Sequence, residues 1–296
     1  MMGNVKSNLA ILALVLASAS NADIPKYYGY DWIDPYPTTA TVAYSNIKDH
    51  TNLNVVHTIA ALNSSACNNG GCVLGISAGQ SDVYVDICPN KTTDETCSAV
   101  GYGNIWNIIS SVKAATNKPT AIYFIDEPFY EAALKSNNVY VTYRYSSYIC
   151  TLNDAMSAYS LKIPIFTILA ENQYRNPDYR SEINNGIPVT GCPATIKSTV
   201  DWIGIDNYTW TNKQQVIDAY NLLDPTKKFK WVMVPASSYD VANNAYMIGF
   251  YKEAAEIANN FVYIMNFKYD NRVVTGSGQL ADTVRSFGMY IKNLHK

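Results

Sequence analysis

Two adjacent carboxylic acids, Asp126 and Glu127, follow a run of apolar residues in the segment IYFIDEPFY. Burying a carboxyl group beside such a run costs free energy unless the group is hydrogen-bonded or protonated, so its pKa rises. A raised pKa suits a general acid that works near neutral pH. Pro128 cannot donate to a neighbouring strand and therefore predicts a strand end here. An ordinary strand end with solvated acids is the alternative, and we favour the catalytic interpretation.

Short apolar or aromatic segments along the chain are predicted to be the strands that position these acids. They span 27–33, 53–60, 82–87, 120–127, 163–170, 201–208, 230–236 and 261–267. Predicted helices lie at 41–49, 104–116, 137–158, 194–199, 212–222, 241–259 and 279–293, whereas 61–81 is predicted to be mostly a disulfide-bearing loop. This alternation in 296 residues predicts a single-domain (β/α)8 TIM barrel. A doubly wound sheet is disfavoured because no glycine-rich phosphate loop follows any strand.

In a (β/α)8 barrel the functional residues lie at the carboxyl ends of the strands. Asp206 ends the sixth predicted strand and is a candidate second carboxylate opposite Glu127, at the separation of about 6.5–9.5 Å expected of an inverting pair. The candidate substrate-binding residues at other strand ends are Asp31, Trp32, Glu171, Asn207, Tyr208, Trp210, Tyr239 and Lys268. Aromatic rings pack on the apolar faces of sugars, and carboxylates and amides bind their hydroxyls. An oligo- or polysaccharide substrate is therefore predicted.

Several strand-end residues also have a structural interpretation. His57 lies within the second predicted strand and is interpreted as a hydrogen-bonded core residue rather than a catalyst. Glu171 begins the polar segment ENQYRNPDYR, where it either binds sugar or is solvated. Tyr208 and Trp210 either form a platform for a sugar ring or pack at the barrel rim.

The sequence Asp126-Glu127-Pro128 resembles the large clan of (β/α)8 glycoside hydrolases with Asn-Glu-Pro at the end of strand four. The resemblance implies that Glu127 is the acid/base and that Asp126 stands where the clan has Asn. The clan's nucleophile is a Glu at the end of strand seven, which the segment KWVMVPASSYD lacks. The Asp-Glu pair also resembles the substrate-assisted hexosaminidases, which implies that Asp126 orients an acetamido group of the substrate. In the other route, Asp206 is the base of an inverting reaction.

The function predicted from these residues is glycosidic hydrolysis by carboxylate acid/base catalysis, without a cofactor. A catalytically inactive barrel that binds carbohydrate or a host surface is the alternative, and the missing strand-seven Glu favours it. No metal is predicted, because His50, His57 and His295 form no H-E-x-x-H motif. A net charge of −2 gives no support for nucleic-acid binding.

The first 22 residues have the pattern of a secretory signal peptide. The apolar run 9–17 is too short to span a bilayer, and Ser20 and Ala22 occupy the small-residue positions of a cleavage site. We therefore expect 1–22 to be a signal peptide and 23–296 to be an exported, extracellular or periplasmic, catalytic domain without a further membrane segment.

Six cysteines in an exported chain predict disulfide bonds. Pairing across a short loop has the lowest entropy of closure, so the cysteines that bracket short loops are expected to pair with each other. The predicted pairs are Cys67–Cys72, Cys88–Cys97 and Cys150–Cys192. A zinc site is disfavoured because the chain has no C-x-x-C motif.

Overall fold

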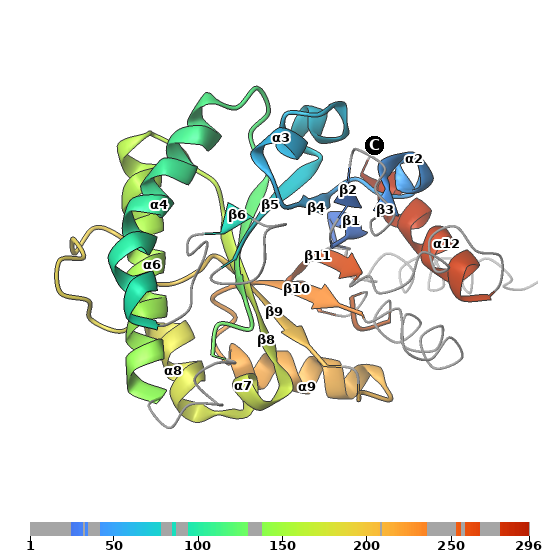
Figure 1. Cartoon of the computed structure of the whole chain (residues 1–296). Helices are drawn as coiled ribbons and strands as arrows, with labels where there is room; N and C mark the ends of the chain where they lie inside the picture. The colour runs from blue at the N-terminus through green and yellow to red at the C-terminus, as the bar shows by residue number, and fades with distance from the viewer. Residues whose placement is uncertain are drawn as a thin grey trace, which may run out of the picture.

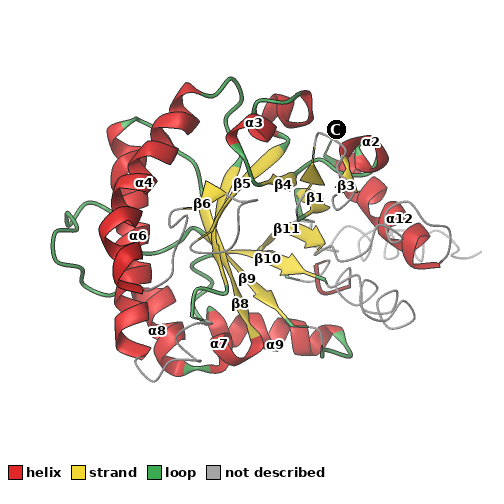
Figure 2. Ribbon diagram, viewed as in Figure 1, coloured by secondary structure: helices red, strands yellow, loops and turns green. Residues whose placement is uncertain are grey.

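Parallel strands curl around a common axis, and helices surround them on the outside (Figures 1 and 2). The computed structural model of the 296-residue chain describes residues 25–31, 33–34, 42–77, 85–86, 94–129, 138–207, 209–235, 253–255, 258–266 and 279–295. The barrel strands are β1 (Tyr27–Tyr30), β4 (Asn54–Val56), β5 (Cys72–Ser77), β7 (Ala121–Asp126), β8 (Ile165–Ala170), β9 (Trp202–Asp206), β10 (Lys230–Val234) and β11 (Phe261–Asn266). They are hydrogen-bonded in the order β1-β11-β10-β9-β8-β7-β5-β4, with every neighbouring pair parallel. The predicted (β/α)8 barrel is confirmed.

Helices and shorter strands occupy the segments between the barrel strands. The helices are α2 (Tyr44–Ile47), α3 (Ile59–Leu62), the 3-10 helix η1 (Ser65–Gly70), α4 (Asp94–Ala114), α6 (Asn138–Ala158), α7 (Glu171–Arg175), α8 (Pro177–Asn185), α9 (Lys213–Leu223) and α12 (Gln279–Leu294). Two short strands, β2 (Ile33–Asp34) and β3 (Val42–Ala43), pair with each other, and β6 (Val85–Asp86) pairs with β5. The predicted helices at 137–158, 212–222 and 279–293 are confirmed to within one residue at either end.

Asparagine side chains help to close the barrel between β1 and β4. The Oδ1 atom of Asn52 accepts a hydrogen bond from the Tyr28 amide at 2.8 Å, and that of Asn54 accepts from the Tyr30 amide at 3.1 Å. A Cβ atom at Gly29 would lie 1.6 Å from a backbone carbonyl oxygen just before β4, so only glycine fits this close approach. The contact between β1 and β4 therefore depends on side-chain amides as well as on the backbone.

Four stacked aromatic rings fill the interior of the barrel: Tyr27, Tyr123, Phe166 and Trp202. We call this layer the aromatic floor, because the carboxyl ends of the strands extend beyond it. Tyr123 stacks on Phe166 with ring centroids 4.9 Å apart, and Phe166 stacks on Trp202 at 5.8 Å. Trp202 also stacks on Tyr27 at 6.2 Å. Such pairs stabilise a core by about 0.5–1.5 kcal/mol each beyond the burial of their surface. The rings thus make a rigid packed layer rather than an open pore.

The third barrel strand corrects the sequence prediction. We expected a strand at 82–87 and a loop over 61–81, but β5 (Cys72–Ser77) lies between β4 and β7. Of the predicted strand, the structure describes Val85–Asp86, which pair with β5 as β6. The strand CVLGIS begins at a disulfide cysteine, so its residues fall within the segment predicted to be a disulfide-bearing loop.

The helices after β8 are also a correction. The predicted helix at 194–199 is absent, whereas α7 and the start of α8 form in the polar segment 171–180, which was predicted to be a loop. Asn176 caps α8 because its Oδ1 accepts from the Asp178 amide at 2.8 Å, and Pro177 occupies the first helical turn. Local capping therefore outweighs the polar composition of this segment.

Other predicted strands and helices differ from the observed ones in where they begin or end. The strand predicted at 27–33 ends at Tyr30, with β2 separate from it. The helix predicted at 104–116 begins earlier, as α4 at Asp94, and the one predicted at 41–49 is confined to α2. Most of the helix predicted at 241–259 lies outside the described residues, within which 253–255 are helical.

Two of the predicted disulfides, Cys67–Cys72 and Cys150–Cys192, are present and confirm the pairing. The predicted pair of Cys88 and Cys97 lies outside the described side chains. Within the part of the chain that the structure describes, no helix has the length and apolar character needed to cross a membrane. The predicted signal peptide, 1–22, falls outside that part.

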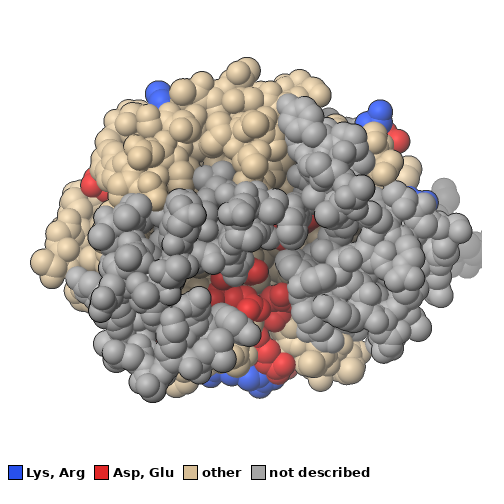
Figure 3. Space-filling model, viewed as in Figure 1, with Lys and Arg blue, Asp and Glu red and all other residues tan. Residues whose placement is uncertain are grey.

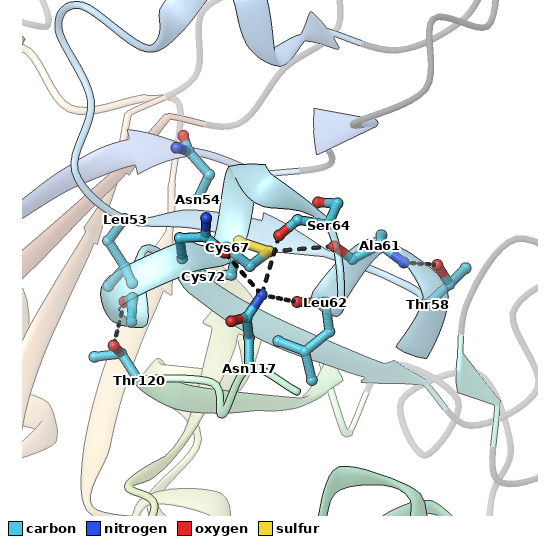
Figure 4. The surroundings of a disulfide bond; sticks show 12 residues. Leu53, Asn54, Thr58, Ala61, Leu62, Ser64, Cys67, Cys72, Asn117 and Thr120 are labelled. Carbon is cyan, nitrogen blue, oxygen red and sulfur yellow. Dashed lines mark hydrogen bonds between the residues drawn. A yellow bond between two sulfur atoms is a disulfide. The ribbon is translucent and has the colours of Figure 1, made fainter. Parts of the chain in front are cut away.

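Asn117 ties the chain around the Cys67–Cys72 bond to the rest of the barrel (Figure 4). Its Nδ2 atom donates to the carbonyl oxygens of Leu62 and Ser64, both at 3.0 Å. The Thr120 hydroxyl donates to the carbonyl of Gly70 in the same loop. These bonds fix the start of β5 next to β7.

Candidate active site

Strand alternation brings Asp31 and Asp206 to the end of the barrel above its aromatic floor. Successive side chains on a strand point to opposite faces, so residues two or four apart share a face. The rings of Trp202 and Tyr27 both lie in the interior stack of the barrel. Asp206 comes four residues after Trp202 and Asp31 four residues after Tyr27, so both acids share the interior face. Acidic groups from two separate strands, β1 and β9, therefore converge at the carboxyl end of the barrel.

A bulge in β7 adds Asp126 to this group. Tyr123 pairs with Phe166 of β8, but Asp126 pairs with Ile168, so β7 has one more residue than β8 across this interval. Ile125, within the bulge, has a φ of 59°, which β-branched residues rarely adopt. Simple alternation would put Asp126 on the face opposite Tyr123. Because of the bulge, the Tyr123 hydroxyl donates a hydrogen bond to Oδ1 of Asp126.

Burial and neighbouring negative charges raise the affinity of Asp126 for a proton. The pKa of Asp126 is raised to about 8, chiefly because the carboxyl is buried and further because of the negative charges of Glu127, Asp31 and Asp206. The hydrogen bond from Tyr123 opposes this rise. Burial also raises the pKa of Glu127. Among the described residues, acidic side chains gather in the central hollow of the face drawn in Figure 3, whereas lysine and arginine lie toward its periphery.

His57 belongs to the same region through its contact with Asp31. Its Nε2 atom lies 3.2 Å from Oδ1 of Asp31, and both side chains are buried. A Cβ atom at residue 75 would lie 2.5 Å from Nδ1 of His57, so Gly75 of β5 leaves the space that the imidazole occupies. The hydrogen bond fits the interpretation of His57 as a core residue, and it also orients the Asp31 carboxylate.

Glu171 and Asn207 lie at the rim in hydrogen-bonded settings. Glu171, at the start of α7, forms an ion pair with Arg175 at 3.1 Å and accepts a hydrogen bond from the Thr209 hydroxyl at 3.4 Å. Asn207 is buried, and its Oδ1 accepts from both the amide and the hydroxyl of Thr209 at 2.8 Å. These contacts shape the turn after β9 and leave the Glu171 carboxylate partly exposed.

Trp210 is 5% exposed and belongs to the core outside the barrel. Its ring centroid lies 6.5 Å from that of Tyr174 in α7. Of its two sequence interpretations, packing at the rim accounts for this burial. Four further candidates lie outside the described residues: Trp32, Tyr208, Tyr239 and Lys268.

Sequence reasoning missed three residues that contact the acidic segment of β7: Tyr123, Thr167 and Gln173. Tyr123 could have been suspected from its place three residues before Asp126, but the bulge that brings the two together has no local signal. Within the described part of the chain, no group of three or more His, Cys, Asp or Glu residues could hold a metal ion.

The raised pKa of Asp126 has a measurable effect on stability. Between about pH 4 and pH 8 the folded state binds the Asp126 proton and the unfolded state has lost it, so stability falls as the pH rises. The slope is up to about 1.4 kcal/mol per pH unit. Asp126→Asn removes this penalty, so its free energy of unfolding relative to wild type should increase from pH 4 to pH 8 and then level off.

Urea unfolding at several pH values measures this difference. Asp218→Asn, on the exposed face of α9, is the matched control and should leave the pH dependence unchanged. If the stability difference between Asp126→Asn and wild type is the same at acid and alkaline pH, the Asp126 carboxyl is not protonated at neutral pH.

The comparisons with known proteins give structural similarity alone. No protein-family model matches the sequence, and no curated protein does. A fungal β-1,4-galactanase aligns at 12% identity over 81% of this chain and 88% of its own, with a TM-score of 0.53. Xylanase 10C of Cellvibrio japonicus, in complex with xylopentaose, aligns at 8% identity over 93% of this chain and 68% of its own, with a TM-score of 0.52.

A β-glucuronidase 2 of Bacteroides uniformis aligns at 10% identity over 83% of this chain, with a TM-score of 0.55. The aligned region is 30% of the glucuronidase chain. At these identities the likeness establishes the fold and not the activity. The chain therefore shares the (β/α)8 barrel of these glycoside hydrolases.

Proposed function

We propose that this chain hydrolyses a glycosidic bond at the carboxyl end of its barrel. The observation that carries the proposal is the group of four acidic residues at the carboxyl end of the barrel, Asp31, Asp126, Glu127 and Asp206, within which burial raises the pKa of Asp126 and that of Glu127. Groups with such shifted pKa values in the mouth of a barrel are typical of acid/base catalysis.

Glu127 is the proton donor in this proposal. Its proton passes to the glycosidic oxygen as the bond between that oxygen and the anomeric carbon breaks. Asp206 accepts a proton from a water molecule whose oxygen bonds to the same carbon from the opposite face. The sugar carries positive charge in the transition state, which surrounding carboxylates stabilise. Each group supplies a rate factor of about 10²–10⁴.

Asp126 supports Glu127 in either of two ways. With a pKa of about 8 it carries a proton at neutral pH, so it can donate a hydrogen bond to a substrate oxygen. In the substrate-assisted route, the Asp126 side chain instead holds the acetamido group of the substrate while that group attacks the anomeric carbon. The two routes differ in their dependence on Asp206.

An oligo- or polysaccharide is the proposed substrate, because the similar structures include a galactanase and a xylanase that binds xylopentaose. Asp31, Glu171 and Asn207 are proposed to bind its hydroxyls, together with the aromatic and polar candidates outside the described residues. Export of 23–296 after removal of 1–22 is also proposed. The two disulfides support it, since disulfides persist in oxidising compartments.

A panel of polysaccharides, oligosaccharides and aryl glycosides tests the proposal. We expect release of reducing ends from at least one member of the panel, and loss of this activity in Glu127→Gln. Saturable binding without hydrolysis across the panel would instead support the inactive carbohydrate-binding barrel. The sequence after β10, PASSYD, favours that alternative because it lacks the Glu found at this position in the clan.

A further inference from the structure

We infer that Thr167 and Gln173 are positioning residues that hold the bulged end of β7 so that Asp126 and Glu127 face the substrate. The inference rests on the proposed function for its catalytic consequence, but the geometry it describes can be measured separately. Both residues come from the next part of the barrel, β8 and α7, and both are fully buried.

Two side chains form hydrogen bonds to the backbone carbonyls on either side of Asp126. The Thr167 hydroxyl donates to the carbonyl oxygen of Ile125 at 2.8 Å. The Nε2 atom of Gln173 donates to the carbonyl oxygen of Glu127 at 3.1 Å. The Oε1 atom of Gln173 accepts from the Ala170 amide at 3.3 Å, which fixes the orientation of the Gln173 amide.

The backbone from Ile125 to Glu127 has a strained conformation that requires contacts from the surrounding structure. Ile125 has a φ of 59° and Glu127 a φ of 43°, both in the left-handed region that favours glycine. Such strain persists only where the surroundings hold it. The Glu127 amide also donates to the Ile168 carbonyl at 3.0 Å, so β8 contacts the bulge through its backbone as well.

The support decides which way Asp126 faces. In a regular strand Asp126 would point away from Tyr123, because side chains alternate. The chain just after Glu127 is held in place, because Phe129 is fully buried and stacks on Tyr179 of α8 with ring centroids 4.3 Å apart. A change in the backbone of the bulge therefore cannot be compensated by movement at Phe129. Loss of the bonds from β8 and α7 would therefore change the bulge itself and move both acids.

Thr167→Val and Gln173→Met test the inference, because each removes a donor while keeping the approximate shape of the side chain. We expect either variant to lower kcat by about 10- to 100-fold with little change in KM, since a misplacement of about 1 Å can cost about 10²-fold. Thr151→Val is the matched control, because the Thr151 hydroxyl also donates to a backbone carbonyl, but within α6. It should leave kcat unchanged, and Thr167→Ser, which keeps the hydroxyl, should retain wild-type kcat.

The second readout needs no activity. Carbon-13 NMR follows the titration of the Asp126 carboxyl, identified by its loss in Asp126→Asn. In the wild type we expect a pKa near 8 and in Thr167→Val and Gln173→Met a lower pKa, as the carboxyl leaves its buried place among Glu127, Asp31 and Asp206. A shift in these variants but not in Thr151→Val supports the positioning role even if no glycoside is hydrolysed, an outcome that would refute only the proposed function.

If Thr167→Val and Gln173→Met fold and keep both the wild-type pKa of Asp126 and the wild-type kcat, the inference is overturned. If one of the two fails to fold, the other decides the matter, because the hydrogen bonds come from different elements. A lowered kcat or a lowered pKa of Asp126 in Thr167→Ser would also contradict the role of the hydroxyl.

Discussion

Glu127→Gln is expected to lower kcat on an unactivated oligosaccharide by about 10²–10⁴-fold. Glutamine keeps the shape of the side chain and its hydrogen-bonding capacity but has no proton to transfer. The loss is confined to the transition state, so substrate affinity should change little. Initial rates over a range of substrate concentrations separate kcat from KM and check both expectations.

An activated aryl glycoside distinguishes a lost proton donor from a damaged site. A good leaving group needs little protonation, so Glu127→Gln should slow its cleavage far less than that of the natural substrate. A misfolded site would slow both alike. Glu253→Gln is the control, because Glu253 is exposed and pairs with Lys213 on the surface at 3.0 Å. Near-wild-type turnover of the unactivated substrate by Glu127→Gln would show that Glu127 is not the acid.

The sequence predicts the barrel well where strands are apolar on both faces. IFTILA and WIGID, the sequences of β8 and β9, are mostly apolar on both their interior and their exterior faces, as is typical of parallel strands covered by helices. CVLGIS, the sequence of β5, is equally buried over its described side chains, but it begins at a disulfide cysteine and its place in the barrel comes from its pairing with β4 and β7. Without that pairing its composition resembles that of the disulfide loop before it.

The candidate site is predicted in its residue types and missed in its local geometry. Asp126, Glu127 and Asp206 stand at the ends of strands, which topology alone brings to one face of a barrel. Whether Asp126 points inward depends on the bulge, and the bulge depends on how β7 aligns with β8. A single strand carries no information on that alignment.

Thr167 and Gln173 illustrate the same limit. A threonine within a buried strand and a glutamine at the start of a helix are ordinary residues in the sequence. Their importance comes from the two carbonyl oxygens of β7 that their side chains reach. Trp210 shows the converse, because its burial depends on α7, a helix that forms where the composition predicts a loop.

Asp206→Asn is expected to slow natural and activated substrates alike, by about 10²–10⁴-fold, if Asp206 is the base. Water must be deprotonated whatever group departs, so a better leaving group cannot compensate for a missing base. The variant should also lower the pKa of Asp126, because the charge of Asp206 is one cause of its rise. Asp218→Asn on the surface of α9 is the control for the change from aspartate to asparagine.

The same variant decides between the two routes. In the substrate-assisted route the acetamido group of the sugar attacks the anomeric carbon, so Asp206 is not needed as a base, and Asp206→Asn should retain most of its activity. Asp126→Asn should then abolish cleavage of N-acetylated sugars. Strong loss in Asp206→Asn with equal effects on both leaving groups supports the inverting route. Near-wild-type rates in both Asp206→Asn and Asp126→Asn would contradict both routes, because each assigns an essential step to one of these carboxyl groups.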